Sequence, residues 1–212
     1  MPVNRENFMY EYKDANGNVT DKEFRSYAIE YHVKGLLQSL GADLEDSSMR
    51  ETPTRMAKYL KEVFEGQLYT NKEIAEKFDK QFEIGSDDLV IIKDITVFSH
   101  CEHHGALMYD GKIAIAYLPQ NGKVLGLSKF ARISELVCKR FQVQERIVRD
   151  IAEVLEYLGM KDFMVVMYDT KHACMTTRGV KNYTSKTDAL LTRGEFRRKD
   201  QLEDRVLRAL GL

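Results

Sequence analysis

The sequence has little net charge, few cysteines and no long hydrophobic run. Its 212 residues carry 32 Lys and Arg against 33 Asp and Glu, so the formal net charge is -1. Proteins that bind duplex nucleic acid normally have a basic excess, which displaces counterions from the phosphates. We therefore expect no nucleic-acid partner, and any anionic ligand has to be met by local basic residues.

No window of the chain approaches the apolar length needed to span a bilayer, and residues 1–20 lack a basic segment followed by an apolar run. These absences predict a cytoplasmic protein without a membrane partner. Hydrophobic residues make up 43% and charged residues 31%, which is typical of an ordinary globular chain. The length suits one domain with a substantial core, or a small domain with a helical appendage.

Only three cysteines are present, Cys101, Cys138 and Cys174. Their number is odd and the cytoplasm is reducing, so metal binding or catalysis is a better explanation for them than disulfide formation. Cys138 lies in an apolar helical stripe and is interpreted as a core thiol. The other two lie next to histidines.

The first part of the chain has mainly helical periodicity. Thr20 and Glu23 fit a capping box at the start of a helix. Helices are predicted over about 21–40, 52–66 and 71–82. We divide the chain into an N-terminal helical segment, 1–85, and a catalytic domain, 86–212, which together form one functional unit.

From Asp88 onward β-branched residues indicate strands. The turn Gln120-Asn121-Gly122 suggests a hairpin within 113–125, and helical periodicity returns over 128–158. Further strands are predicted at 163–168, 173–176 and 184–192, followed by a helix at 199–210. The pattern predicts an α+β fold in which an antiparallel sheet is backed by one long helix.

Most metal-binding side chains fall in two short motifs, CEHH at 101–104 and HAC at 172–174. The first motif follows a predicted strand, and the second is assigned to one. Residues two apart on a strand point to the same face, so His172 and Cys174 can converge on one point.

Thiolate and imidazole are the usual zinc ligands, and three protein ligands leave a fourth position open for water. Cys101, His104 and Cys174 would form such an open site, in which Zn²⁺ activates water for hydrolysis. His103 and His172 are then candidate proton shuttles, because the unperturbed pKa of histidine lies near neutrality. The alternative is a closed, non-catalytic site that His103 or His172 completes as fourth ligand.

Basic residues gather at a predicted strand-to-helix junction. The sequence GLSK at 126–129 is followed by Arg132, and a helix start favours anions through its backbone amides and dipole. This is the outline of a polyphosphate site, although the spacing is not that of a nucleotide P-loop. Arg178, shortly after the HAC motif, could add a second guanidinium.

Glu145 has two interpretations. It could be a solvated glutamate that pairs with Arg149 one helical turn away. It could instead accept hydrogen bonds from the N–H edge of a purine. Its position on the helix leaves both possibilities open.

Taken together, CEHH, GLSK with Arg132, QVQER and HACMTTRG resemble the GTP cyclohydrolase I family in their order and spacing. The resemblance runs from Glu51-Thr52-Pro53-x-Arg55 to Gly194-x-Phe196, about two-thirds of the 212 residues. CEHH with a distant H-x-C-x3-R-G is a specific signature, whereas the T-P-x-R element alone is not.

The resemblance implies one zinc ion per subunit on Cys101, His104 and Cys174, with His103 and His172 as the catalytic histidines. It further implies proton transfer by Ser128, guanine recognition by Glu145 and Gln144, and triphosphate contacts from Lys129, Arg132, Arg178 and, from a neighbouring subunit, Arg55.

The implied reaction is hydrolysis and ring rearrangement of GTP to 7,8-dihydroneopterin triphosphate with release of formate. This would be the first step of folate, pterin or deazaguanine biosynthesis. The implied fold is the T-fold, an antiparallel sheet with long helices on one face, whose subunits form a toroidal homodecamer with active sites at subunit interfaces. Open sheet edges in a monomer also favour such an oligomer.

Two departures from the family pattern are visible. The stretch from Gly105 to Asp110 replaces an apolar pair followed by Pro-Phe and is one residue longer. The N-terminal part is poor in regulatory features. Two other functions compete with the main one. The first is a T-fold relative acting on another purine, such as a deazapurine nitrile reductase with a nucleophilic cysteine and NADPH. The second is a non-catalytic zinc protein that binds nucleotides.

Overall fold

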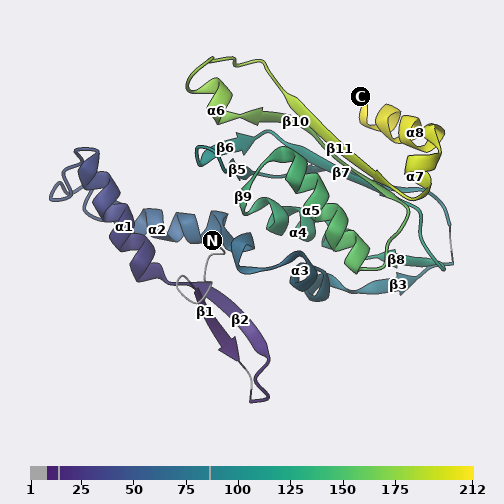
Figure 1. Cartoon of the computed structure of the whole chain (residues 1–212), viewed down its shortest axis with the longest axis horizontal. Coiled ribbons are helices and arrows are strands. Elements are labelled where there is room, and N and C mark those ends of the chain that lie inside the picture. The colour runs from purple at the N-terminus through teal and green to yellow at the C-terminus, as the bar shows by residue number, and fades with distance from the viewer. Residues whose placement is uncertain (1–8, 14, 86) are drawn as a thin grey trace. The chain divides into compact units, whose positions relative to one another are not determined.

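The computed structural model describes residues 9–13, 15–85 and 87–212, which form two compact units (Figure 1). The first unit ends at Leu68 and the second begins at Tyr69. The sequence predicted the boundary at 85/86, on the assumption that all early helices belong together. The boundary lies earlier because α3 (Asn71–Phe78) buries its apolar side in the core of the second unit.

The N-terminal unit begins with a hairpin. Strands β1 (Met9–Lys13) and β2 (Val19–Phe24) pair antiparallel and are followed by α1 (Ser26–Ser39), α2 (Thr52–Val63) and a 3-10 helix (Glu65–Leu68). The predicted helix start at residue 21 is therefore wrong. Glu23 does not cap a helix, because it accepts hydrogen bonds from the Tyr12 hydroxyl at 3.2 Å and the Lys61 amine at 2.6 Å.

The second helix confirms the prediction more closely. It begins at Thr52, with proline in its first turn. Proline suits this position because the first amides of a helix have no intrahelical acceptor. The N-cap residue is Glu51.

The C-terminal unit contains a seven-stranded sheet and a separate two-stranded one. The large sheet comprises β4 (Val90–Thr96), β5 (Ser99–Cys101), β6 (Ala106–Tyr109), β7 (Lys112–Tyr117), β9 (Phe141–Gln142), β10 (Phe163–His172) and β11 (Thr187–Arg193). The small sheet pairs β3 (Gln81–Glu83) with β8 (Lys123–Leu125). All pairs are antiparallel except β5 with β9, which is parallel, so the expected purely antiparallel sheet needs this correction.

Strand β10 is the central strand of the large sheet. Its first half pairs with β7 and its last two residues pair with β6, in one continuous register. On its other side it pairs with β11. Strands β6 and β7 thus behave as one long strand interrupted at Asp110, whose φ of 58° turns the chain locally. Aspartate tolerates this left-handed conformation better than most residues.

Helices cover both faces of this sheet. Ile113, Ile115 and Val165 face a core that includes α3, α4 (Leu127–Cys138) and α5 (Gln144–Tyr157). The intervening Ala114 and Ala116 face the opposite side, where α7 (Glu195–Arg198) and α8 (Asp200–Leu210) pack through Phe196 and Val206. The expectation of helices on one face was therefore incomplete, because the alternation of strand side chains leaves a second apolar face.

The single helix predicted over 128–158 is two helices separated by β9. Arg140 lies at the break and is buried. Its guanidinium donates to the Asp150 carboxylate at 3.0 Å, the Asn71 side chain at 2.7 Å and the Tyr69 carbonyl at 2.9 Å. Periodicity does not reveal this buried ion pair, so the sequence pattern appeared continuous.

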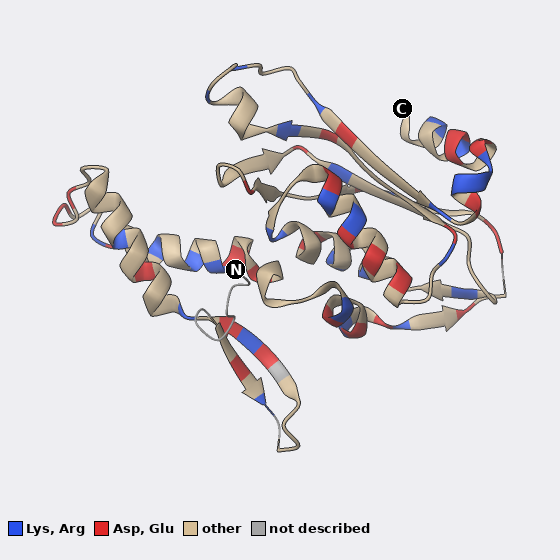
Figure 2. Ribbon diagram, in the orientation of Figure 1, with Lys and Arg blue, Asp and Glu red and all other residues tan. Residues whose placement is uncertain are grey.

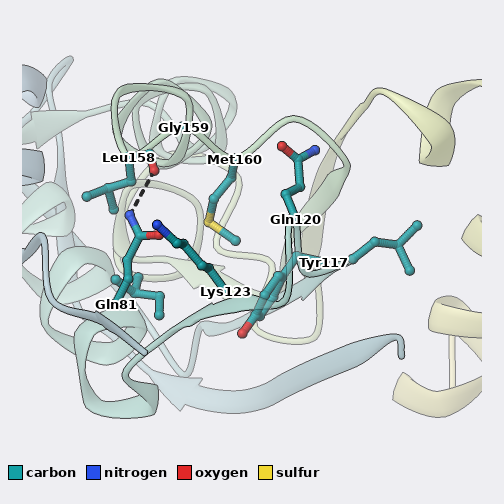
Figure 3. Close-up of a pocket in the computed structure, with 9 residues that line it drawn as sticks. Gln81, Tyr117, Gln120, Lys123, Leu158, Gly159 and Met160 are labelled. Atoms are coloured by element: carbon teal, nitrogen blue, oxygen red, sulfur yellow. Dashed lines mark hydrogen bonds between the residues drawn. The ribbon is translucent and has the colours of Figure 1, made fainter. Parts of the chain in front are cut away.

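The predicted hairpin within 113–125 is partly wrong. The turn forms, with positive φ at Asn121 (54°) and Gly122 (68°), but β7 and β8 join different sheets. A cavity of about 40 Å³ beside this turn is lined by Gln81, Tyr117 and Lys123 among others (Figure 3). Such a volume has room for a few water molecules at most. Tyr117 pairs with Phe163 at the start of β10, so the cavity lies at the opposite end of that strand from the HAC motif.

Acidic and basic residues are intermixed along α5 and α8 (Figure 2), in keeping with the near-zero net charge. No helix within the described residues is long and apolar enough to cross a membrane.

Gly194 provides a stability test. Its φ is 56°, and an added Cβ would collide with the Asp162 carboxylate and the Lys161 carbonyl. That carboxylate cannot withdraw cheaply, because it accepts hydrogen bonds from the Glu195 amide and the Gln120 side chain, both at 2.8 Å. We expect Gly194→Ala to lower the free energy of unfolding by at least about 3 kcal/mol, measured by chemical denaturation.

The matched control is Gly159→Ala. Gly159 also has a positive φ, 83°, but a Cβ there meets nothing within 4 Å. It should cost only about 1 kcal/mol of backbone strain. Equal losses for the two variants would contradict the proposed collision.

Candidate metal and proton-transfer site

The CEHH motif forms the turn of the β5–β6 hairpin. Cys101 ends β5 and pairs with Ala106, and its carbonyl accepts a hydrogen bond from the Gly105 amide at 2.8 Å. Gly105 has a φ of 62°, which closes the turn. The departure from the family pattern after His104 is thus a tight hairpin. Cys101 is buried, whereas His103 and His104 are exposed in the turn.

The HAC motif lies at the end of β10. His172 is the last residue of that strand, and residues 173–176 form the short helix α6 (Ala173–Thr176) instead of the predicted strand. The argument that His172 and Cys174 share a strand face is therefore wrong in its premise. Cys174 is brought into the site by the first turn of α6.

Strand register explains why the two motifs meet. Ser99 and His172 pair with the same residue of β6, Met108, from opposite sides. Because β5 and β10 are both antiparallel to β6, they run in the same direction. The residues that follow Ser99 and His172 therefore emerge at one end of the sheet, where Cys101 and Cys174 lie.

The Cys101 and Cys174 thiols are in hydrogen-bonding contact and neither is in a disulfide. Burial raises the pKa of Cys174, and the neighbouring Cys101 sulfur raises it further. Two facing thiols, one of which has a raised pKa because the other lies beside it, are a donor set that suits a thiophilic cation. Cys138, by contrast, is fully buried in the core, where burial raises the pKa of its thiol, as predicted for a structural cysteine.

The two histidines of the turn have different partners. His103 Nδ1 lies 3.5 Å from Cys101 Sγ, and His104 Nε2 accepts a hydrogen bond from Arg178 Nη1 at 3.0 Å. Across the described ranges, no three His, Cys, Asp or Glu side chains are placed closely enough to hold a metal ion. The structure thus assembles the two predicted thiol ligands, while Arg178 engages the third, His104.

His172 is held by Gln144. The Gln144 amide group donates to the carbonyls of Met167 at 3.2 Å and Thr187 at 2.7 Å, which turns its oxygen toward His172 Nε2 at 3.0 Å. An amide oxygen only accepts, so Nε2 carries the proton and Nδ1 keeps a lone pair. Both Gln144 amide hydrogens are engaged within the protein. Sequence reasoning assigned Gln144 only to substrate contact and missed this orienting function.

The environment of His172 keeps the ring neutral. Burial lowers its pKa, and the Glu145 carboxylate opposes this effect. Glu145 itself is exposed at the start of α5. Although both residues are described, no ion pair joins Glu145 to Arg149, so the pairing part of the surface interpretation is not supported. The exposure of Glu145 does fit a solvated glutamate.

Arg178 joins this cluster through His104, but the predicted site residues on α4 do not. Ser128, Lys129 and Arg132 lie on the first turns of α4, whose N-cap is Gly126, so the predicted strand-to-helix junction is confirmed. In the part of the chain that the structure describes, no hydrogen bond or ion pair connects these three side chains to the thiols and histidines. The cluster side of the sheet adjoins the other end of α4, where Ser99 donates to the Cys138 carbonyl at 2.7 Å. Positions 129 and 138 are about 14 Å apart along a helix.

Arg55 belongs to α2 in the N-terminal unit and pairs with Glu51 at 2.7 Å. Both side chains are largely exposed, so the guanidinium is accessible for another partner. Its predicted triphosphate contact stays a prediction.

Facing thiols flanked by imidazoles, one of them oriented by a buried amide, define the class of this protein. It is an α+β protein whose site gathers the side-chain types that enzymes use to bind soft metal ions and to transfer protons.

Comparisons with known proteins identify the family. The sequence model described as GTP cyclohydrolase I matches residues 29–211. A protein named GTP cyclohydrolase 1 from Clostridium botulinum (strain Loch Maree / Type A3) is 47% identical over 175 residues, 80% of this chain and 89% of that protein. Proteins of the same name from Clostridium acetobutylicum and Ruminiclostridium cellulolyticum are 43% and 48% identical over 185 residues, covering 85% and 84% of this chain and 94% of each relative. The chain belongs to the GTP cyclohydrolase I family.

The thiol pair can be tested in metal-free protein. Alkylation requires the thiolate, so the raised pKa of Cys174 should make it react slowly at pH 8. Replacing Cys101 by alanine removes the neighbouring sulfur and should lower the pKa of Cys174, which speeds its alkylation several-fold. Mass spectrometry of the peptide that contains Cys174 measures the rate.

Cys138→Ala serves as the control, because that thiol lies in the core away from the pair. It should leave the rate at Cys174 unchanged. If Cys101→Ala also left that rate unchanged, the contact between the two thiols would not exist in solution.

Proposed function

We propose that this protein hydrolyses GTP and rearranges it to 7,8-dihydroneopterin triphosphate with release of formate. The observation that carries the proposal is the convergence of Cys101, Cys174 and the oriented His172 at one end of the sheet, in a chain that belongs to this family. The product would enter folate, pterin or deazaguanine biosynthesis.

We further propose that Cys101, Cys174 and His104 hold zinc. The donor chemistry fits, because two free thiols already face each other and His104 lies in the turn that follows Cys101. His104 would exchange its hydrogen bond with Arg178 for the metal. Bound zinc would supply the Lewis acidity that hydrolysis requires. A reducing cytoplasm, the location we expect, would keep both thiols available.

His172 is suited to move a proton through Nδ1. Gln144 occupies Nε2, and burial lowers the pKa of the ring, so the neutral form with a free Nδ1 lone pair prevails near neutral pH. Glu145, exposed and next to Gln144 in the chain, would accept hydrogen bonds from the guanine N–H edge and so orient the base. His103 would serve as the second proton carrier.

The triphosphate would be bound by Lys129, Arg132 and Arg178, with Ser128 in later proton transfers. Lys129 and Arg132 lie at the far end of α4 from the thiols, which favours a site that two subunits complete. A neighbouring copy, by supplying Arg55 and other basic residues, would provide the missing charge. We therefore propose a homo-oligomer, a toroidal decamer as in the family pattern.

The decisive experiment is incubation of the purified, zinc-loaded protein with GTP. Formate and a neopterin that fluoresces after oxidation are the expected products. Absence of pterin at full zinc occupancy would contradict the proposed reaction. A nitrile reductase would instead consume NADPH, and a non-catalytic zinc protein would bind GTP unchanged.

Two variants separate ligands from proton carriers. We expect His172→Ala to retain zinc and to lose ring opening by at least about 100-fold in kcat, a typical loss for a general acid or base. We expect Cys174→Ser to release the zinc, because a hydroxyl is a poor replacement for a thiolate. Metal content and formate release are measured for both.

Loss of zinc from His172→Ala would mean that this histidine is a ligand. Wild-type zinc affinity in Cys174→Ser would exclude that cysteine from the metal site.

A further inference from the structure

Glu102 lies between Cys101 and His103 in the sequence, and the function proposed above gives it no part. Its carboxylate accepts two hydrogen bonds from Arg146, from Nη1 at 2.7 Å and from Nη2 at 2.9 Å. Arg146 directly follows Glu145 on the first turn of α5. This ion pair joins the turn that carries the two histidines to the helix that carries the expected guanine anchor.

Backbone hydrogen bonds also connect this turn to the segment just before α5. The Glu102 amide donates to the Gln142 carbonyl at 2.9 Å, and Cys101 pairs with Gln142 where β5 and β9 run parallel. Glu102 is thus held at two points. Its amide binds Gln142, shortly before α5, and its carboxylate binds Arg146 on α5. Two attachments fix both the position and the orientation of the turn.

Two carboxylates lie near enough to Arg146 to influence its charge, those of Glu102 and Asp150, and the second is already bound by other residues. Asp150, one helical turn further on, is bound by Arg140 at 3.0 Å and by the Gln142 amide at 2.8 Å. A guanidinium that meets one carboxylate with two parallel bonds is strongly directional. Both Glu102 oxygens are occupied, so this residue is poorly placed to carry protons itself.

The pair contributes little to folding. The side chains of Arg146 and Glu102 are 40% and 33% exposed, and ion pairs of that exposure contribute little to stability. The effect of this ion pair is therefore on the position of the turn rather than on the free energy of folding. We propose that the Glu102–Arg146 pair is a positioning clamp that fixes the turn bearing His103 and His104 relative to Glu145.

The clamp rests on the proposed function, because it matters only if Glu145 holds the base on which those histidines act. Misplacement of reacting groups by a fraction of an ångström to an ångström is costly in rate, even when every catalytic side chain is present. Loosening the turn should thus lower kcat more than it raises KM for GTP.

The test is a double-mutant cycle in the full-length, zinc-loaded protein. Glu102→Gln and Arg146→Gln should each lower kcat about tenfold, with zinc content unchanged. The double variant should be no slower than either single variant, because both remove the same contact. Arg146→Lys keeps the charge but cannot form the two parallel bonds. Its kcat should therefore be as low as that of Arg146→Gln.

The matched control lies at the other end of α5. Glu156 accepts a hydrogen bond from Arg193 at 2.6 Å, with side chains 44% and 36% exposed. Arg193→Gln breaks an ion pair of the same kind far from the turn. It should leave kcat unchanged and shift the melting temperature as little as Arg146→Gln does.

A second readout does not depend on activity. Hydrogen exchange of the backbone amides over 102–105 should be faster in Arg146→Gln than in wild type, and unchanged in Arg193→Gln.

Additive losses in the double variant would overturn the clamp, and so would unchanged exchange in the turn. Loss of zinc from Glu102→Gln would assign the residue to metal binding instead. If the wild type makes no pterin while exchange in the turn still depends on Arg146, the proposed reaction fails and the structural link stands.

Discussion

The site depends on the common direction of β5 and β10, which are both antiparallel to β6. Ser99 and His172 pair with the same residue, Met108, so the chain segments that follow them leave the sheet side by side. Two cysteines far apart in the sequence meet there because backbone hydrogen bonds fix the register. A slip of one residue in β5 would turn the Cys101 side chain to the other face of the sheet.

Buried polar groups then fix the orientation of the side chains that strand register brings together. Gln144 gives both amide hydrogens to backbone carbonyls, so its oxygen can only accept from His172. This is a precise form of control, because a satisfied buried network has one low-energy arrangement. Arg140 acts in the same way at the break between α4 and α5, where its ion pair with Asp150 anchors the short strand β9. That strand in turn supports the end of β5.

The wrong predictions share one cause, which is that local patterns ignore partners distant in sequence. Thr20 and Glu23 have the letters of a capping box, yet a hairpin partner makes that stretch a strand. Residues 173–176 looked like a strand but form a helix that begins where β10 ends at His172. The apparent helix over 128–158 breaks at Arg140, because a buried guanidinium needs hydrogen-bond acceptors. Asp150 and the Tyr69 carbonyl provide them.

The sequence by itself determined the α+β class, the family, and the residue types of the site, because metal-binding side chains of this kind cluster only in CEHH and HAC. It also placed the helix start beside Lys129. Only the tertiary structure decided that the two thiols touch, that Gln144 orients His172, and that Glu102 is tied to α5. The physical reason is that periodicity encodes which face of an element is buried, whereas hydrogen-bond partners across strands depend on register and on side chains far away in the chain.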